Sequence, residues 1–223
     1  MHVAIDEFQQ IGNYEEKTTE AMLRTLIQRC TNTSFIFAGS KRHVMANMFT
    51  SPSKPFYQSS ITMGLNPIPL DTYCQFAVRM FKLGERSIDE DVVRSVYEDY
   101  NGCIWFMQMM MNELFALTPT GETCFKDMLA QAKRGIILSQ EQTYKETLSQ
   151  MAPRQKMLLQ AIARDKEARN ITSQEFISRH SLPSASSVQS AAKGLLSSDI
   201  ITKDDDAYRI YDYFFSEWLA KVY

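Results

Sequence analysis

The stretch that decides the fold is His2-Val3-Ala4-Ile5-Asp6-Glu7, a short apolar run that ends in two consecutive carboxylates. A run of this kind predicts a β-strand. In open α/β folds the carboxyl ends of parallel strands form the edge at which ligands bind, so we expect Asp6 and Glu7 at such an edge. A simpler interpretation stays open, because a strand can end in acidic residues merely where the chain leaves the core for water.

The residues that follow extend this strand into a small parallel sheet. Residues 15–29 carry apolar side chains at helical spacing, and residues 34–40 form a continuous apolar run of strand length. The first pattern predicts a helix with one buried face, and the second is typical of a strand buried on both faces. Strand, helix and strand in this order form a βαβ unit. A second helix is expected at residues 42–49 and a weaker third strand at residues 60–65.

The middle of the chain is predicted to be helical. Asn66-Pro67-Ile68-Pro69 is a rigid break, and apolar residues then recur at helical spacing. The expected helices lie at residues 71–81, 89–100, 103–117 and 121–134. The methionine-rich stretch at residues 105–111 could form a pliable binding groove. Its helical spacing favours the interior of the helical module instead.

The last third of the chain predicts a winged helix. Three helices are expected, at residues 141–164 with an interruption near Pro153, at residues 172–180 and at residues 184–197. Two alternating strands joined by Asp204-Asp205-Asp206 follow, and then a final helix. Three helices followed by a β-hairpin are typical of a helix-turn-helix with a wing.

The composition indicates an ordinary globular chain. The 223 residues are 44% hydrophobic and carry a formal net charge of −2, so no overall field favours nucleic acid or an anionic membrane. The four cysteines are far apart and accompany three histidines, which argues against a zinc or haem centre and suggests small core residues in a reducing compartment. With neither a signal peptide nor a membrane-length apolar run, we expect a cytoplasmic protein.

The Asp6-Glu7 pair has the pattern of a Walker B strand in a P-loop NTPase. In that chemistry Asp6 would hold Mg²⁺, usually through water, and Glu7 would orient or deprotonate the attacking water. Both roles require a phosphate-binding loop of the form G-x-x-x-x-G-K-[ST]. None of the eight glycines is followed by lysine, so these 223 residues contain no Walker A motif.

With its segments in this order, the chain resembles the C-terminal two-thirds of the archaeal-type ATPases, a branch of the P-loop AAA+/STAND NTPases. The similar stretches are Val3–Gln9 (Walker B), Phe35–Ser40 (sensor strand), Asn66–Leu70 (linker into the lid), Tyr100–Cys103 (sensor-like turn) and Tyr208–Leu219 (closing wing and helix). The resemblance implies a mainly α fold with a small parallel α/β sheet. Its expected domains are a partial P-loop NTPase core at residues 1–68, a helical lid at residues 69–138 and a winged helix at residues 139–223.

The resemblance also implies site residues and cofactors. ATP and Mg²⁺ are implied for a full-length protein, with Asp6, Ser40 and Gly102 in cofactor binding. Ser40 would sense the γ-phosphate or the attacking water beside Asp6, although it could instead cap the helix that begins near Arg42. Gln58 stands where many relatives carry an arginine, which leaves open whether any arginine contacts the γ-phosphate there.

The winged helix offers a second candidate surface. Gln189 and Lys193 lie on the expected helix at residues 184–197 and could contact nucleic acid or a protein partner. Basic and acidic residues are nearly equal in number after residue 150, and the acidic turn at residues 204–206 would repel phosphate. The pattern favours a protein-interaction or regulatory role over tight DNA binding.

Two functions follow from these patterns. The first is the C-terminal portion of an ATP-binding AAA+/STAND-type switch, unable to hydrolyse ATP without the loop that stabilises the transferred phosphoryl group. The alternative is a non-enzymatic winged-helix interaction or DNA-binding regulatory protein that keeps the NTPase core as a scaffold. In both cases an unpaired sheet edge and an exposed apolar face would favour self-association.

Overall fold

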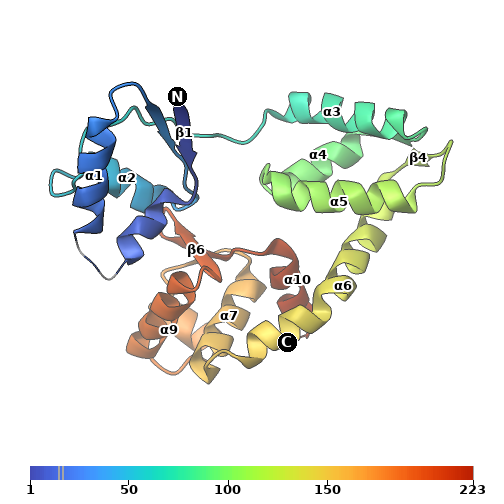
Figure 1. Ribbon diagram of the computed structural model, residues 1–223. Coiled ribbons are helices and arrows are strands. Elements are labelled where there is room, and N and C mark those ends of the chain that lie inside the picture. Colours follow the sequence, from blue (N-terminus) through green and yellow to red (C-terminus); the bar gives the residue numbers. More distant parts are fainter. Residues whose placement is uncertain (15, 17, 223) are drawn as a thin grey trace. The chain divides into compact units, whose positions relative to one another are not determined.

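The computed structural model describes residues 1–14, 16 and 18–222. The chain divides into two compact units, Met1–Asn66 and Pro67–Tyr223. Figure 1 shows the first unit in blue and cyan, and the second in green through red.

The first unit is built on a parallel pair of strands. Its elements are β1 (His2–Ile5), the 3-10 helix η1 (Phe8–Asn13), α1 (Thr19–Arg29), β2 (Ser34–Phe37) and α2 (Arg42–Thr50). β1 and β2 pair in parallel with Val3 opposite Phe35, and α1 connects them. This confirms the predicted βαβ unit. The beginning of the predicted helix, at Glu15 and Lys17, lies outside the described residues.

Four phenylalanines form the core of the first unit. They are Phe8, Phe37, Phe49 and Phe56, whose ring centroids lie 4.3 to 5.9 Å apart. Aromatic pairs at such separations stabilise a core by about 0.5–1.5 kcal/mol each beyond the buried area. Phe8 is 2% exposed and comes directly after Asp6-Glu7, so the core fixes the direction in which the chain leaves β1.

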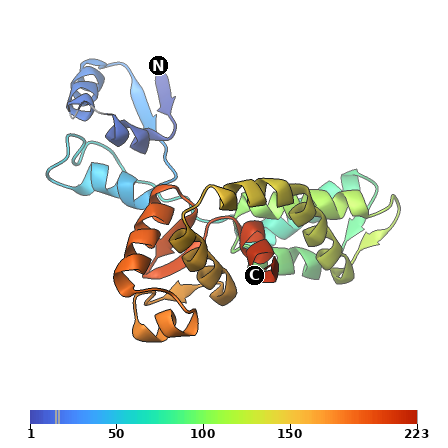
Figure 2. The same ribbon diagram turned by 90° about the horizontal axis from the view of Figure 1, so that it is seen from below.

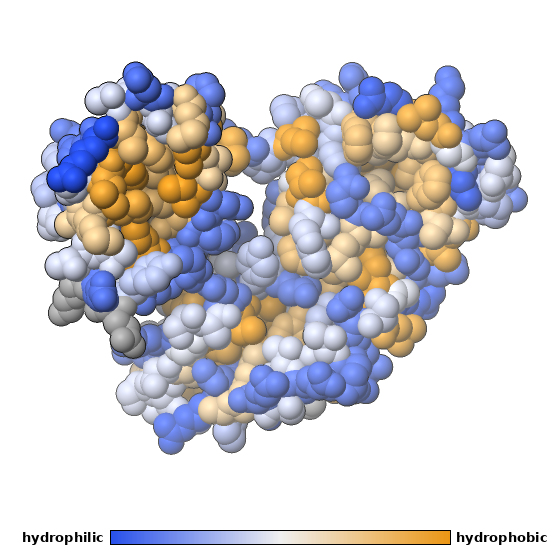
Figure 3. Space-filling model, viewed as in Figure 1, coloured by the Kyte–Doolittle hydropathy of each residue, from blue (hydrophilic) through white to orange (hydrophobic). Residues whose placement is uncertain are grey.

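The prediction that the second strand is buried on both faces is wrong. Ile5 and Phe37 pack against the phenylalanine core, but Ile36 on the opposite face is 60% exposed. The reason is that the helices of this unit contribute to the core on one face of the sheet. Met22 and Leu26 on α1 are also exposed, and Figure 3 shows apolar surface (orange) over this unit.

The predicted third strand at residues 60–65 does not form. This stretch has no strand assignment, and Figure 1 shows it as an open connection that leads into α3 (Leu70–Leu83). Among the described residues no strand pairs with this stretch, and Pro67 and Pro69, which follow it, lack the amide donors that a sheet ladder needs.

The second unit begins with a helical module. Its elements are α3, β3 (Ser87–Ile88), α4 (Glu90–Asp99), α5 (Ile104–Leu117), β4 (Thr123–Cys124), the 3-10 helix η2 (Lys126–Met128) and α6 (Leu129–Ser149). The first three predicted helices are confirmed. The fourth is wrong at its start, because residues 123–128 form β4 and η2, and α6 continues through the expected domain boundary between residues 138 and 139.

The winged helix follows in the predicted order. Its elements are α7 (Pro153–Asp165), β5 (Ala168–Arg169), α8 (Gln174–Arg179), α9 (Ala185–Ser197), β6 (Ile201–Asp204), β7 (Ala207–Ile210) and α10 (Tyr213–Val222). Ser173 and Ser184 cap α8 and α9 with their side chains, as their sequence positions indicate. β5 completes a sheet of order β5-β7-β6.

One continuous core joins the helical module to the winged helix. Met107 and Met110 are buried in it, so the interior interpretation is confirmed for these methionines, whereas Trp105 of the same stretch is 62% exposed. The ring of Phe214 on α10 lies 5.3 Å from Tyr100 and 5.9 Å from Phe106. Figures 1 and 2 both show α10 beside α6. The two parts of this unit therefore stabilise each other.

The structure shows where the cysteines lie and how long and apolar the helices are. Cys74 and Cys124 are buried as predicted for core cysteines, but Cys30 is exposed, because it follows the last turn of α1 at the surface. In the part of the chain that the structure describes, no helix combines the length and the apolar character needed to span a bilayer.

Gly102 forms the tight turn between α4 and α5. Its φ is +68°, and an added Cβ would lie 2.8 Å from Cβ of Pro67 and 2.9 Å from the Tyr97 ring. We expect Gly102→Ala to lower the free energy of unfolding by about 1–3 kcal/mol, because strain and a steric clash add. Urea unfolding measures this. The matched control is Gly121→Ala, where φ is +83° but nothing lies within 4 Å, and its loss should be smaller. Equal losses would contradict the packing argument.

Candidate functional site

The carboxyl ends of β1 and β2 bring three of the predicted site residues to one edge. The amide of Phe8 donates to the carbonyl of Ala38 at 2.9 Å, and the amide of Ala38 donates to the carbonyl of Ile5 at 2.9 Å. These bonds extend the strand pairing, so that Glu7 and Ser40 meet. The Ser40 hydroxyl donates to Oε2 of Glu7 at 3.2 Å.

The structure distinguishes between the two roles expected for Ser40. Lys41 occupies the N-cap position of α2, which has no side-chain cap hydrogen bond. The Ser40 hydroxyl contacts Glu7 instead. We expected Ser40 beside Asp6, but its hydroxyl donates to the carboxylate of Glu7 instead. Asp6 accepts a hydrogen bond from the amide of Glu7 at 2.8 Å.

Gln9 belongs to this strand-end cluster, although the sequence reasoning gave it no role. Its side chain is buried, at 3% exposure, and its Nε2 donates to Oε2 of Glu7 and, at 3.4 Å, to Ser40. Its Oε1 has no hydrogen-bond partner among the described residues. A Cβ on Gly39 would clash with this oxygen. The sequence offered one signal for this role: Gln9 follows Glu7 by two positions, and Gly39, which leaves room for the Gln9 side chain, precedes Ser40.

The donor set at this edge fits a partial magnesium site. Asp6 and Glu7 are exposed, and the described residues include no group of three or more His, Cys, Asp or Glu that could hold a metal ion. Mg²⁺ is usually held by one or two carboxylates together with substrate phosphates and water. The oxygens of Asp6, Glu7 and Ser40 therefore suit an ion that a nucleotide delivers.

Gly102, the remaining predicted cofactor residue, lies in the second unit. It is buried and packs against Pro67 and Tyr97. The structure therefore gives it a packing role, and its role in nucleotide binding stays a prediction.

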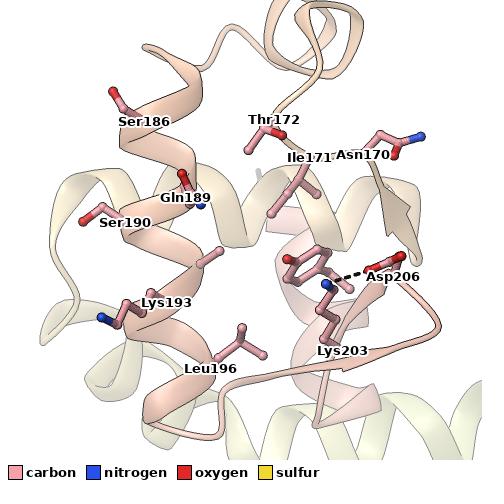
Figure 4. Close-up of a pocket in the computed structure, with 12 residues that line it drawn as sticks. Asn170, Ile171, Thr172, Ser186, Gln189, Ser190, Lys193, Leu196, Lys203 and Asp206 are labelled. Atoms are coloured by element: carbon pink, nitrogen blue, oxygen red, sulfur yellow. Dashed lines mark ion pairs between the residues drawn. The ribbon is translucent and has the colours of Figure 1, made fainter.

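The winged helix carries a surface groove between α9 and the β6-β7 hairpin. Its volume is about 820 Å³, and it includes the predicted contact residues Gln189 and Lys193. Figure 4 shows Gln189 on α9 across the groove from Lys203 and Asp206 of the hairpin. The volume lies within the range of about 300–1,000 Å³ that is usual for ligand sites.

The charges around this groove largely cancel. Nζ of Lys203 pairs with Asp206 at 2.7 Å, and this hydrogen bond raises the pKa of Lys203 and lowers the pKa of Asp206. Lys193 is exposed, with no ion pair recorded among the described residues. A site for duplex DNA needs several cations that are free to meet phosphates, and this groove offers Lys193 alone among its described lining residues.

Glu167 links the short strand β5 to the hairpin beside the groove by accepting hydrogen bonds from an arginine of each. Nε of Arg209 and Nε of Arg169 each donate to its carboxylate at 2.9 Å. The hydrogen bonds from Arg209 and then Arg169 lower the pKa of Glu167 below its ordinary value of 4.5. A carboxyl group with a lowered pKa stabilises the fold above its ordinary pKa, and this contribution disappears as the pH falls through the lowered value.

We therefore expect Glu167→Gln to destabilise the winged helix at pH 7 and to have a smaller effect at pH 3.5. The measurement is the urea midpoint of both proteins at the two pH values. Glu98→Gln is the control, because Glu98 is exposed and has no ion pair recorded among the described residues. A Glu167→Gln difference that does not shrink toward pH 3.5 would contradict the assignment.

Comparisons with known proteins agree with this architecture. A family described as a probable winged helix domain matches residues 142–221. The structure is similar to a Walker-type ATPase of Pyrococcus abyssi, with a TM-score of 0.61 and 18% identity over 98% of this chain and 62% of that chain. It is also similar to two mutants of RuvB from Thermotoga maritima, each with a TM-score of 0.50 and 10% identity over 97% of this chain and 69% of RuvB. No curated protein sequence matches.

These likenesses extend over both units, at identities that establish the fold alone. The chain spans about three-fifths of the length of the Pyrococcus ATPase, at 62%. It combines a mainly helical fold with small sheets, similar to the folds of P-loop ATPases, and a winged helix domain at residues 142–221.

Proposed function

We propose that this chain forms the Walker B edge, the lid and the winged helix of an ATP-binding AAA+/STAND-type switch. The observation that carries the proposal is the hydrogen bond from Ser40 to Glu7 at the carboxyl ends of two parallel strands. An acidic pair at this edge, beside a hydroxyl from the neighbouring strand, suits the binding of a metal-bound phosphate.

Each side chain at the edge has a separate task in this proposal. Asp6 would hold Mg²⁺, and Glu7 would orient the water that attacks the γ-phosphate. Ser40 and Gln9 both donate to Oε2 of Glu7, which keeps this carboxylate in one orientation. When bound, ATP would supply the phosphoryl group and Mg²⁺ would neutralise its charge.

Hydrolysis also needs donors for the β- and γ-phosphates. A Walker A loop supplies them through its amides and lysine, and these 223 residues contain no glycine followed by lysine. We therefore propose that the 223 residues alone do not hydrolyse ATP, and that the longest product of the gene is the form in which to test binding.

The test is the binding of a fluorescent ATP analogue with Mg²⁺ to the longest in-frame product of the gene and to the 223-residue chain. We expect binding by the longer product, weakened at least tenfold by Asp6→Asn, and no binding by the shorter chain. Glu113→Gln, a change in the second unit, is the matched control. If neither form binds, or if Asp6→Asn binds like the wild type, the proposal is wrong.

A second candidate function rests on the winged helix. It is a non-enzymatic interaction module in which the groove contacts a protein partner. The near neutrality of the groove, with Lys203 paired to Asp206, supports a polypeptide over DNA as its ligand. Binding of a partner that is unchanged by Asp6→Asn and Glu7→Gln would favour this function.

A further inference from the structure

Glu7 has an unusual backbone conformation for a residue at the end of a strand. Its φ and ψ are 48° and 39°, in the left-handed region, which a residue other than glycine adopts at a cost. Such conformations persist where the surrounding structure holds them, and they are common at functional sites. The Glu7 amide donates to Oδ1 of Asp6 at 2.8 Å, and the Glu7 carbonyl accepts from the amide of Gln10 at 2.9 Å. The backbone of this turn is therefore held on both sides of Glu7.

Both donors to the Glu7 carboxylate act on the same oxygen. The Ser40 hydroxyl donates to Oε2 at 3.2 Å, and Nε2 of Gln9 also donates to Oε2. Within the described part of the chain, Oε1 of Glu7 accepts no hydrogen bond, and the residue is exposed at this edge. The protein therefore holds one oxygen of the carboxylate and leaves the other to accept a proton from water.

The two donors differ in the number of protons that they carry. A serine hydroxyl has one proton, so Ser40 can donate to Glu7 or to a bound phosphate, but not to both. The carboxamide of Gln9 has two protons on Nε2. This nitrogen donates to Glu7 and, at 3.4 Å, to the hydroxyl oxygen of Ser40. Gln9 therefore keeps its bond to Glu7 when another acceptor takes the Ser40 proton.

The surroundings of Gln9 fix which way its carboxamide faces. The residue is 3% exposed. A carboxylate accepts hydrogen bonds but donates none, so the NH2 group of Gln9 must face Glu7. Oε1 of Gln9 then lies beside Gly39 and has no hydrogen-bond partner among the described residues. A buried acceptor without a donor destabilises a fold and calls for an explanation. The orientation of Glu7 supplies one, because the reversed carboxamide would set its oxygen against the carboxylate.

Gly39 leaves the space that this carboxamide occupies. A Cβ at this position would overlap Oε1 of Gln9 and would lie 2.7 and 2.8 Å from Sδ and Cγ of Met45. The Met45 side chain is flexible and can move aside. The carboxamide of Gln9 has less freedom, because its nitrogen is bound to Glu7 and Ser40. A side chain at position 39 would therefore push the carboxamide away from Glu7.

We infer that Gln9 is the positioning residue of this edge: its carboxamide, in the space beside Gly39, holds Oε2 of Glu7, so that Oε1 faces water while Ser40 is free to donate to a bound phosphate. The inference rests on the proposed function for the roles of the water and the phosphate. The hydrogen bonds of Gln9 belong to the chain without nucleotide, so they are tested separately from ATP binding.

The first test is NMR spectroscopy of the 223-residue chain without nucleotide. The carboxamide signals of Gln9 are assigned by their absence from Gln9→Met. A hydrogen bond to a carboxylate is stronger than one to a neutral acceptor, so we expect one carboxamide proton to exchange slowly with solvent. This signal should move upfield and exchange faster in Glu7→Gln and in Gly39→Ala. The control is Gly64→Ala, where nothing lies within 4 Å of the added Cβ. A signal that either Glu7→Gln or Gly39→Ala leaves in place would overturn the inference, whether or not ATP binds.

The second test separates rate from affinity in the longest gene product. Gln9→Met keeps the length of the side chain and removes its carboxamide, so we expect single-turnover release of phosphate to slow by about tenfold or more with little change in the Kd for ATP. Its urea midpoint should not fall, because the unpaired buried oxygen is removed as well. A purely structural role would instead lower the midpoint and leave the rate. The matched control is Gln10→Met, at the exposed neighbouring position, which should keep the wild-type rate.

The contribution of Gly39 is tested by combining the two changes. Gly39→Ala should slow the reaction as Gln9→Met does, and the double variant should be no slower than Gln9→Met, because both changes break one contact. Additive losses would overturn the inference. If Gln9→Met keeps the wild-type rate while Asp6→Asn no longer binds ATP, the inference is wrong and the proposed function stands. If no form binds ATP, the proposed function is wrong, and the role of Gln9 in catalysis is wrong with it.

Discussion

Glu7→Gln is expected to slow ATP hydrolysis by about 100- to 10,000-fold in the nucleotide-binding form of this protein, which is the range that a general base contributes. The substitution keeps the shape of the side chain and removes its ability to accept a proton. Because Glu7 acts on water and not on the nucleotide in this proposal, the Kd for ATP should change little. Single-turnover release of phosphate from the longest gene product measures the rate.

The matched control for this prediction is Glu122→Gln, an exposed glutamate in the second unit. It should hydrolyse ATP at the wild-type rate. A Glu7→Gln protein that keeps its rate would show that the acidic residues at the end of β1 merely mark the exit of the chain from the core. A large loss of ATP affinity would instead assign Glu7 to binding.

Phe214→Ala is expected to lower the free energy of unfolding of the second unit by about 3–5 kcal/mol, the usual result for a buried phenylalanine. Phe214 is 1% exposed and contacts Tyr100 and Phe106 of the helical module. Since a domain is typically stable by about 5–15 kcal/mol, this is a large fraction of the total. Tyr211→Ala, at a 59% exposed position, should cost under about 1 kcal/mol.

The same contacts predict that the helical module and the winged helix unfold together. Trp105 lies on α5 and Trp218 on α10, and they are the two tryptophans of the chain. Urea unfolding of Trp105→Phe reports on α10, and unfolding of Trp218→Phe reports on α5. Coincident midpoints are expected in each protein once the loss of stability from the substitution itself is taken into account, which is larger for Trp218, 4% exposed, than for Trp105, 62% exposed. Two well-separated transitions would show that the helical module and the winged helix are independent domains.

The sequence predicted those parts of the fold whose signals are local. Asp6-Glu7 after an apolar run marked the end of β1, and helical spacing predicted helices at residues 172–180 and 184–197, within which α8 and α9 lie. The acidic turn of the hairpin also followed from local pattern, since Asp205 and Asp206 adopt positive φ values of 46° and 64°, which aspartate tolerates better than most residues.

The parts that the sequence missed depend on partners distant in the chain. Residues 60–65 alternate like a strand, but no described strand pairs with them. β5 is the reverse case, because the pair Ala168–Arg169 becomes a strand only through β7. Gln9 joins the candidate site because the ends of β1 and β2 meet, and its own residue type does not reveal this.

In the proposed function, a nucleotide-bound metal sits at the carboxyl ends of β1 and β2. The most direct measurement is paramagnetic broadening in NMR spectra of the longest gene product, with Mn²⁺ replacing Mg²⁺ and a nonhydrolysable ATP analogue bound. We expect strong broadening of the methyl signals of Ile5 and Ala38, which is lost in Asp6→Asn. If the methyl signals of Ile5 and Ala38 are not broadened, the metal does not bind at this edge and the proposal is wrong.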